Sequence, residues 1–218
     1  MCMRDRRAKY RLRSAICALH ANCASVQSEV EHMARPFLII VTGCPGSGKT
    51  TLAGELARAA RLPLVSRDAI KEGWVRTAGR PHDELPPDAN LRATELFFRS
   101  VECLVEGGAS LVAEAAFQHA VWAARVEPLL PRARVRVCVC EPGGPATSYA
   151  RFVARAQADP LREYYHGAPP RMAPGINPMA AWLDYQPPRL NAPTFIVDTT
   201  DGYSPNIDQL LSELLTGD

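Results

Sequence analysis

Short apolar runs alternate with longer amphipathic stretches along the chain from residue 36 onward. The apolar runs predict five strands, over residues 37–42, 62–66, 110–115, 134–140 and 194–197. The stretches between them have helical periodicity and predict helices over residues 49–61, 68–76, 88–106, 119–130 and 207–215. Strands separated by helices of this length predict right-handed crossovers and an α/β fold, a parallel sheet flanked by helices on both faces.

Two of these segments indicate which side chains are buried. In the predicted helix 88–106, the apolar stripe is expected to contain Leu91, Leu96, Phe97 and Val101. In the predicted strand 134–140, the valines lie on one face and the cysteines on the other, as in a strand buried on both sides.

The seven cysteines do not form a metal-binding or disulfide pattern. Cys138 and Cys140 alternate with valines along a strand, and no C-x-x-C pair or nearby histidine cluster suggests zinc. We therefore predict a reduced, cytoplasmic protein without a zinc site. No apolar stretch approaches the ~20 residues that a membrane-spanning helix needs, so no membrane partner is expected.

The formal net charge of +2 is concentrated at the N-terminus, where residues 1–32 hold more basic than acidic side chains. This segment lacks a sustained apolar face, and we interpret it as a dispensable extension, disordered or the product of a mis-assigned start; a transit sequence or a docking helix is the alternative. Residues 33–218 are predicted to form one domain. Because this body is nearly neutral, composition does not favour nucleic acid as a partner, although a local basic patch stays open.

A glycine-rich loop follows the first predicted strand and fits the pattern G-x-x-x-x-G-K-S/T. Its backbone N–H groups are expected to surround phosphate oxygens, with Lys49 on the β- and γ-phosphates and the Thr50 hydroxyl on Mg²⁺. The predicted nucleotide-binding residues are Gly43, Cys44, Pro45, Gly46, Ser47, Gly48, Lys49, Thr50 and Thr51.

Carboxylates stand at the ends of the next two strands in the sequence. Asp68 follows the second strand, where it would accept the proton of an attacking hydroxyl or, alternatively, serve as a helix N-cap. Arg67 and Lys71 beside it would contact the acceptor or the γ-phosphate, or be solvated helix charges. Glu114 ends the third strand and is a candidate for holding Mg²⁺ through water or touching substrate, although Asp is the usual residue there.

The segment 147–190 is predicted to be a lid, because its proline-rich second half lacks a regular pattern. Arg151 and Arg155 are one helical turn apart and would neutralise charge on the transferred phosphoryl group, with Arg162 and His166 following at the tip. Ordinary exposed charges are the alternative for each. The aromatic candidates for stacking on an acceptor are Tyr164, Tyr165, Trp182 and Tyr185.

The loop 43–51 and the string Ser66-Arg67-Asp68-Ala69-Ile70-Lys71 resemble the P-loop kinases grouped with 5′-hydroxyl polynucleotide kinases, zeta-toxin-like kinases and chloramphenicol phosphotransferases, an AAA-type ATP-binding group. The arginine pattern of the lid and the segment 197–205 are also similar to that group. The resemblance covers about residues 36–216. It implies a nucleoside-monophosphate-kinase-like sheet of order 2-3-1-4-5, a lid, and ATP as the phosphoryl donor; it also supplies most of the case for Asp68 as the base.

These features together predict an ATP-dependent phosphotransferase with Mg²⁺ as cofactor and a small-molecule hydroxyl, of a metabolite or antibiotic, as acceptor. A 5′-hydroxyl polynucleotide kinase is the alternative, and it would require a basic track leading to Asp68. Arg132, Arg134 and Arg136 alternate along a strand and are the candidates for that track, or else strand-edge charges. A regulatory module that only hydrolyses ATP is the alternative from a different class.

Overall fold

The structure is a computed structural model that describes residues 35–167, 177 and 179–216. The predicted N-terminal extension and the middle of the predicted lid lie outside these residues. The division of the chain at residue 33 therefore stays a prediction. No helix in the described ranges is long and apolar enough to cross a membrane.

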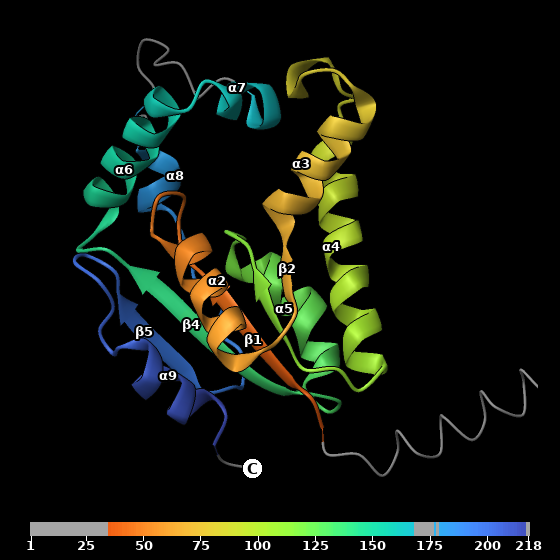
Figure 1. Ribbon diagram of the computed structural model, residues 1–218, viewed down its shortest axis with the longest axis vertical. Coiled ribbons are helices and arrows are strands. Elements are labelled where there is room, and N and C mark those ends of the chain that lie inside the picture. The colour runs from red at the N-terminus through yellow and green to blue at the C-terminus, as the bar shows by residue number, and fades with distance from the viewer. Residues whose placement is uncertain (1–34, 168–176, 178, 217–218) are drawn as a thin grey trace, which may run out of the picture. The chain divides into compact units, whose positions relative to one another are not determined.

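Five parallel strands form one sheet in the order β2-β3-β1-β4-β5 (Figure 1). This confirms the predicted fold class and strand order. The strands are β1 (Phe37–Thr42), β2 (Leu64–Ser66), β3 (Leu111–Glu114), β4 (Arg134–Glu141) and β5 (Thr194–Asp198). Because all five run the same way, their carboxyl ends meet at one edge, where ligands of open α/β sheets bind.

Helices cover both faces of this sheet. The α-helices of the described residues are α2 (Lys49–Ala60), α3 (Arg67–Ala78), α4 (Ala89–Glu106), α5 (His119–Val126), α6 (Pro145–Ala158), α7 (Leu161–His166), α8 (Ala180–Leu183) and α9 (Ile207–Leu214). Short 3₁₀ turns occupy His82–Glu84 and Glu127–Leu129. Figure 1 shows α6, α7 and the upper part of α3 beyond the carboxyl ends of the strands, on the side where a ligand would bind.

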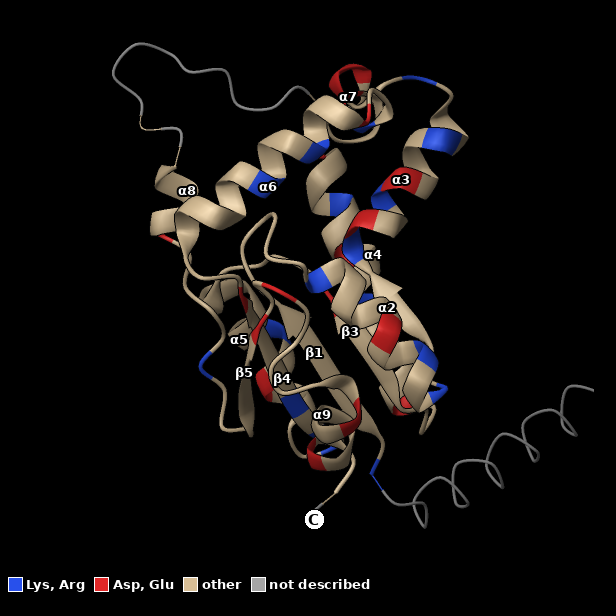
Figure 2. Ribbon diagram, turned by 60° about the vertical axis from the view of Figure 1, so that its left-hand side comes forward, with Lys and Arg blue, Asp and Glu red and all other residues tan. Residues whose placement is uncertain are grey.

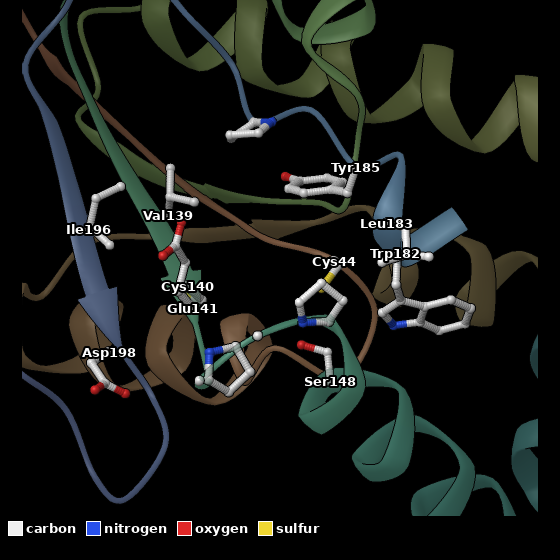
Figure 3. Close-up of a pocket in the computed structure, with 15 residues that line it drawn as sticks. Cys44, Val139, Cys140, Glu141, Ser148, Trp182, Leu183, Tyr185, Ile196 and Asp198 are labelled. Atoms are coloured by element: carbon white, nitrogen blue, oxygen red, sulfur yellow. The ribbon is translucent and has the colours of Figure 1, made fainter. Parts of the chain in front are cut away.

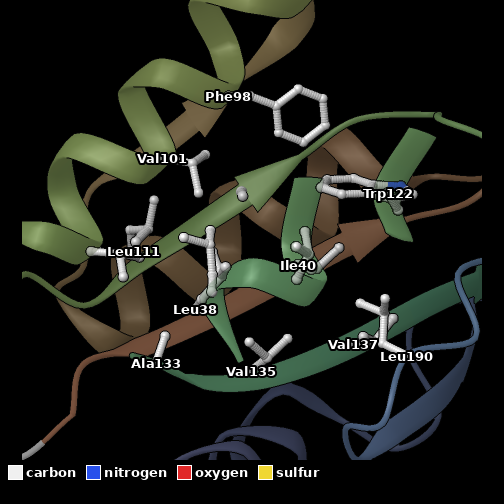
Figure 4. Packing of buried hydrophobic residues seen from close by; sticks show 14 of the residues in the cluster. Leu38, Ile40, Phe98, Val101, Leu111, Trp122, Ala133, Val135, Val137 and Leu190 are labelled. Carbon is white, nitrogen blue, oxygen red and sulfur yellow. The ribbon is translucent and has the colours of Figure 1, made fainter. Parts of the chain in front are cut away.

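The alternation of side chains along each strand divides the core into two layers. On one face, Val135 and Val137 of β4 pack with Phe98 of α4 and Trp122 of α5 (Figure 4). Val139 of β4 and Phe97 of α4 belong to the same cluster. On the other face, Cys138 and Cys140 pack with residues of α2 and α9. The predicted separation of valines and cysteines in β4 is thus confirmed.

The predicted stripe of α4 is partly wrong. Leu91 and Leu96 are 62% and 51% exposed. The buried side chains instead recur every fourth position and add a neighbouring phenylalanine: Ala89, Ala93, Phe97, Phe98, Val101 and Val105. Helical spacing connects Ala89 and Ala93 to Phe97, but small alanines give a weaker hydrophobic signal in the sequence than the exposed leucines.

The arginines proposed as a basic track lie at the wrong edge of the sheet. Arg134 is paired with Phe37 at the start of β1, and β1 and β4 are parallel. Arg132 forms an ion pair with Glu106 at 3.0 Å, and the guanidinium of Arg136 lies over the Phe37 ring. The three side chains are therefore at the amino edge of the sheet, opposite the glycine-rich loop, and cannot lead to Asp68.

Candidate active site

The loop between β1 and α2 has the backbone geometry of an anion cradle. Gly46 and Gly48 have φ values of 83° and 86°, a left-handed conformation that favours glycine. The backbone N–H groups of Gly46, Gly48 and Lys49 donate no hydrogen bond to any described residue. Unpaired amides at the start of α2, together with the helix dipole, fit a phosphate group.

Helix α6 lies directly on this loop. A Cβ atom built on Gly46 would be 2.1 Å from the carbonyl oxygen of Ser148 and 3.0 Å from the backbone nitrogen of Phe152. The indole Nε1 of Trp182 in α8 donates to the carbonyl oxygen of Pro45 at 2.7 Å. Two elements of the predicted lid are thus in contact with the loop.

This close approach leads to a prediction for Gly46→Ala. The methyl group would both strain a left-handed backbone and push α6 off the loop, so we expect an ATP analogue to bind at least about tenfold more weakly. Titration calorimetry with Mg²⁺ and AMP-PNP measures this. The matched control is Gly54→Ala in α2, where a Cβ meets nothing within 4 Å; equal affinity loss in both variants would contradict the prediction.

Glu114 joins the end of β3 to the loop. Its side chain is 1% exposed, and its Oε1 accepts from the Thr50 hydroxyl at 3.2 Å and lies 3.8 Å from Lys49 Nζ. Its Oε2 accepts from the Ser66 hydroxyl at 2.7 Å. A hydroxyl and a carboxylate side by side are oxygen ligands suited to Mg²⁺, so Thr50 and Glu114 fit the predicted metal.

The start of α3 places Asp68 beside Lys49 at one cavity. Ser66, not Asp68, is the N-cap, since the Ser66 hydroxyl accepts from the backbone nitrogen of Ala69. The N-cap interpretation of Asp68 is therefore wrong. Burial raises the pKa of the Asp68 carboxyl, but Lys49, Arg67 and His166 outweigh burial and hold that pKa below its usual range. Asp68 is consequently ionised at neutral pH.

Arg67 is held by two partners. Its Nη1 donates to Asp68 Oδ1 at 3.2 Å, and its Nη2 donates to Asn90 Oδ1 at 2.9 Å. The guanidinium therefore fixes the Asp68 carboxylate against α4. Arg67 is therefore not a solvated helix charge, since its side chain is 15% exposed, and a direct contact with the acceptor or the γ-phosphate stays a prediction.

A cavity of about 430 Å³ lies between α3, the glycine-rich loop and the pair α6–α7. Figure 2 shows basic segments on both α3 and α6. The predicted site residues that line the cavity are Pro45, Lys49, Asp68, Lys71, Arg155, Arg162 and His166. Residues from segments more than a hundred positions apart in the sequence therefore line one cavity.

His166 closes the α7 side of this cavity. Its Nε2 lies 2.9 Å from Glu72 Oε1, in hydrogen-bonding contact. Burial lowers the pKa of His166 more than the nearby Asp68 charge and the Glu72 hydrogen bond raise it. The neutral imidazole can keep the contact by donating from Nε2, which connects α7 to α3 across the cavity.

Arg151 and Arg155 have different surroundings although they are one turn apart on α6. Arg151 donates to the carbonyl oxygens of Thr199 and Thr200, at 2.9 and 2.6 Å. Arg155 lines the cavity with Arg162. The arrangement brings Arg155 to Asp68 and Lys49, whereas Arg151 connects α6 to the segment after β5.

The aromatic residues considered for stacking lie elsewhere. Tyr164 and Tyr165 pack in a small cluster with Val75, and the Tyr185 hydroxyl is 2.8 Å from the Thr42 hydroxyl. None of the four candidates lines the cavity that holds Asp68; the aromatic side chain that does is Phe152.

A second cavity, of about 560 Å³, borders the other side of the loop at Cys44 (Figure 3). Tyr185 and Trp182 lie around it, and carboxylates of Glu141 and Asp198 are at its margin. No lysine or arginine among the described residues lines it. Its charge is therefore unsuited to a triphosphate, in contrast to the cavity at Asp68.

Two residues that support the site have no role predicted from the sequence, although both lie in segments that resemble the kinase group. Ser66 caps α3 and binds Glu114, and its position at the end of β2, two residues before Asp68, could have indicated this. The Thr199 hydroxyl donates to the carbonyl oxygen of Ser47 at 2.7 Å, which fixes the loop to the segment after β5. No local pattern marks a contact between residues so far apart.

The glycine-rich loop, the start of α3 and most of α6–α7 fall within a family match. A family model described as an AAA domain (AAA_33) matches residues 38–165. The chain belongs to this family. No curated protein sequence matches it.

Solved structures share the fold of this AAA-family chain. A candidate kinase from Chloroflexus aurantiacus is 24% identical, with a TM-score of 0.68 over 83% of this chain and 97% of that chain. A gluconokinase from Sinorhizobium meliloti is 16% identical, with a TM-score of 0.51 over 84% and 93% of the two chains. Shikimate kinase from Acinetobacter baumannii is 17% identical, with a TM-score of 0.50 over 87% and 94%. The family match confirms the predicted AAA-type group, and these structures confirm its P-loop kinase fold.

Proposed function

We propose that this chain is an ATP-dependent phosphotransferase that moves the γ-phosphoryl group to a hydroxyl of a small molecule. The observation that carries the proposal is the placement of Lys49 and Asp68 on one cavity, with Arg155 on its opposite side. In-line transfer to a hydroxyl needs a cation that holds the phosphates and an ionised carboxylate that orients the hydroxyl, and both must face the same cavity.

Each residue has a role set by its position. The amides of the loop and Lys49 hold the phosphates, while Arg155 faces the group in transfer and stabilises its charge. Asp68 orients the acceptor hydroxyl by accepting its hydrogen bond. Because the pKa of Asp68 is low, Asp68 is a weak base, and it takes the proton of the acceptor hydroxyl late in the reaction. This order fits a loose transition state, in which the bond from the hydroxyl oxygen to phosphorus forms late.

Thr50 and Glu114 are the residues that would hold Mg²⁺, which when bound neutralises phosphate charge. Helix α6 covers the loop at Gly46, and a cover of this kind limits the access of water to the phosphates, which favours transfer to a bound hydroxyl over hydrolysis. The gluconokinase and the shikimate kinase have this fold and are named as kinases of small molecules, which supports a small-molecule acceptor here.

The test is ADP formation measured with a panel of acceptors: hydroxylated metabolites, antibiotics, nucleosides and short oligonucleotides. We expect at least one small-molecule acceptor to raise ADP formation well above the rate with water alone, with Lys49→Ala as the blank. An unchanged rate with every acceptor would favour the regulatory ATPase. Stimulation by oligonucleotides with a steep inverse salt dependence would instead favour the polynucleotide kinase.

A further inference from the structure

The wall of the cavity at Asp68 carries four cations, Lys49, Lys71, Arg155 and Arg162, against two carboxylates, Asp68 and Glu163. Lys49 lies 3.8 Å from Glu114, and Asp68 is bonded by Arg67. The three other cations on the cavity wall are Lys71, Arg155 and Arg162. Within the described ranges, the side chains of these three form no hydrogen bond and no ion pair.

Lys71 is the unusual member of this group. It is 3% exposed, and no carboxylate among the described residues is within 4.0 Å of its Nζ. Three carboxylates act on its charge: Asp68, which is bound by Arg67; Glu72, which is bound by His166; and Asp83, which forms no ion pair with Lys71. Burial, followed by the nearby Arg67 charge, lowers the pKa of Lys71 to about 8. A buried ammonium is costly unless an anion accompanies it.

Lys71 lies one helical turn along α3 from Asp68. Lys71 follows Asp68 by three residues on α3, so the two side chains are neighbours on one helix face. A hydroxyl placed at Asp68 for attack on the γ-phosphate therefore has the remainder of its molecule beside Lys71. Arg155 and Arg162, on α6 and α7, face α3 across the same space.

We propose that the phosphoryl acceptor is a small anion, which carries a carboxylate or phosphate monoester in addition to its hydroxyl, and that Lys71 binds this group. The inference rests on the proposed function and specifies its substrate class. A cavity of about 430 Å³ bounded by α6 and α7 suits a small molecule rather than a polymer. The candidate track for a nucleic acid, Arg132, Arg134 and Arg136, lies at the opposite edge of the sheet.

The first test is anion binding with the nucleotide site filled. The full chain is saturated with Mg²⁺ and AMP-PNP and titrated by calorimetry with glycerol, glycerate and glycerol 3-phosphate, which differ at one end only. We expect measurable binding of at least one anion and none of glycerol; the two anions distinguish carboxylate from phosphate. Binding of glycerol as tight as that of both anions, or no anion binding, would overturn the proposal.

The second test measures anion affinity in variants of Lys71. Lys71→Gln is expected to weaken the preferred anion at least about tenfold, the cost of one charged hydrogen bond, while Lys71→Arg restores most of the affinity. The matched control, Arg58→Gln, removes an exposed cation from α2 and should change nothing. Unchanged anion affinity in Lys71→Gln, with AMP-PNP still bound, would overturn the role of Lys71.

The same proteins separate this inference from the proposed function. In the ADP assay, hydroxy acids and phosphorylated alcohols should exceed their neutral counterparts by about a hundredfold in kcat/KM. Equal use of neutral alcohols would contradict the anionic acceptor and leave the phosphotransferase intact. Anion binding without acceptor-stimulated ADP formation would retain the site and contradict the phosphotransferase.

Discussion

Lys49→Ala is expected to lower ATP-dependent phosphoryl transfer by at least about a hundred- to a thousandfold, because it removes the one lysine of the phosphate cradle. Binding of ATP should weaken as well, since a lysine in this position contacts the phosphates before and during transfer. Measurement of kcat/KM at saturating acceptor, with calorimetry for ATP, gives both quantities.

This substitution also affects folding, and the control must separate the two effects. Lys49 is the charge nearest to the buried Glu114, so alanine leaves a carboxylate held by the hydroxyls of Thr50 and Ser66 alone. The double variant Lys49→Ala/Glu114→Gln removes that charge and should regain thermal stability without regaining activity. Its reference is Glu114→Gln alone, because Glu114 would also hold Mg²⁺, and against that reference the double variant should bind ATP more weakly in the absence of Mg²⁺. If activity returned with stability, Lys49 would be a structural residue and its role on the phosphates would be wrong.

Asp68→Asn is expected to lower kcat by about a hundred- to ten-thousandfold and to leave ATP affinity nearly unchanged. The amide keeps the shape of the carboxylate and an oxygen that can accept from Arg67, but it cannot accept the hydroxyl proton. Rapid-quench kinetics report the loss at the transfer step, and calorimetry reports the retained ATP binding.

The matched control for Asp68 is Asp208→Asn. Asp208 is likewise an acidic residue in the first turn of a helix, α9, and is exposed. Both variants lose a similar interaction with a helix dipole, so a loss of activity confined to Asp68→Asn belongs to the chemistry. Full activity in Asp68→Asn would contradict its assignment as the base.

The parts of the site that could be predicted are those set by contiguous sequence. Phosphate binding dictates the glycine spacing and the lysine of the loop 43–51. The strand before the loop and the helix after it can both be predicted from the adjacent sequence, and the fold has both. The same holds for Asp68, which is placed by the end of β2. The strand order was implied by the resemblance, not by periodicity.

The parts that could not be predicted depend on contacts between distant segments. The engagement of Arg151 with carbonyls after β5 and of Arg67 with Asn90 follows from packing of helices against the sheet edge. The location of Arg134 could be inferred only with strand direction, because alternation along a strand does not say which edge its start occupies. In a parallel sheet, charges at the amino ends lie far from the ligand edge.

The cation cluster illustrates the same limit. In the sequence, Lys71, Arg155 and Arg162 are candidates for contact with substrate or phosphate, with ordinary helix charges as the alternative, and the body of the chain is nearly neutral. Only the fold brings them to one cavity and shows that Lys71 is buried. Net charge argues only against a polyanionic partner such as nucleic acid, whereas the local arrangement of charges bears on which small acceptor binds.

The most direct test of the central claim is the fate of the γ-phosphate. ATP labelled at that phosphate is incubated with the protein, Mg²⁺ and the acceptor panel, and the label is followed into products. The account predicts label in a phosphate ester of a small acceptor, lost in both Lys49→Ala and Asp68→Asn. Label recovered solely as inorganic phosphate, whatever acceptor is present, would contradict it.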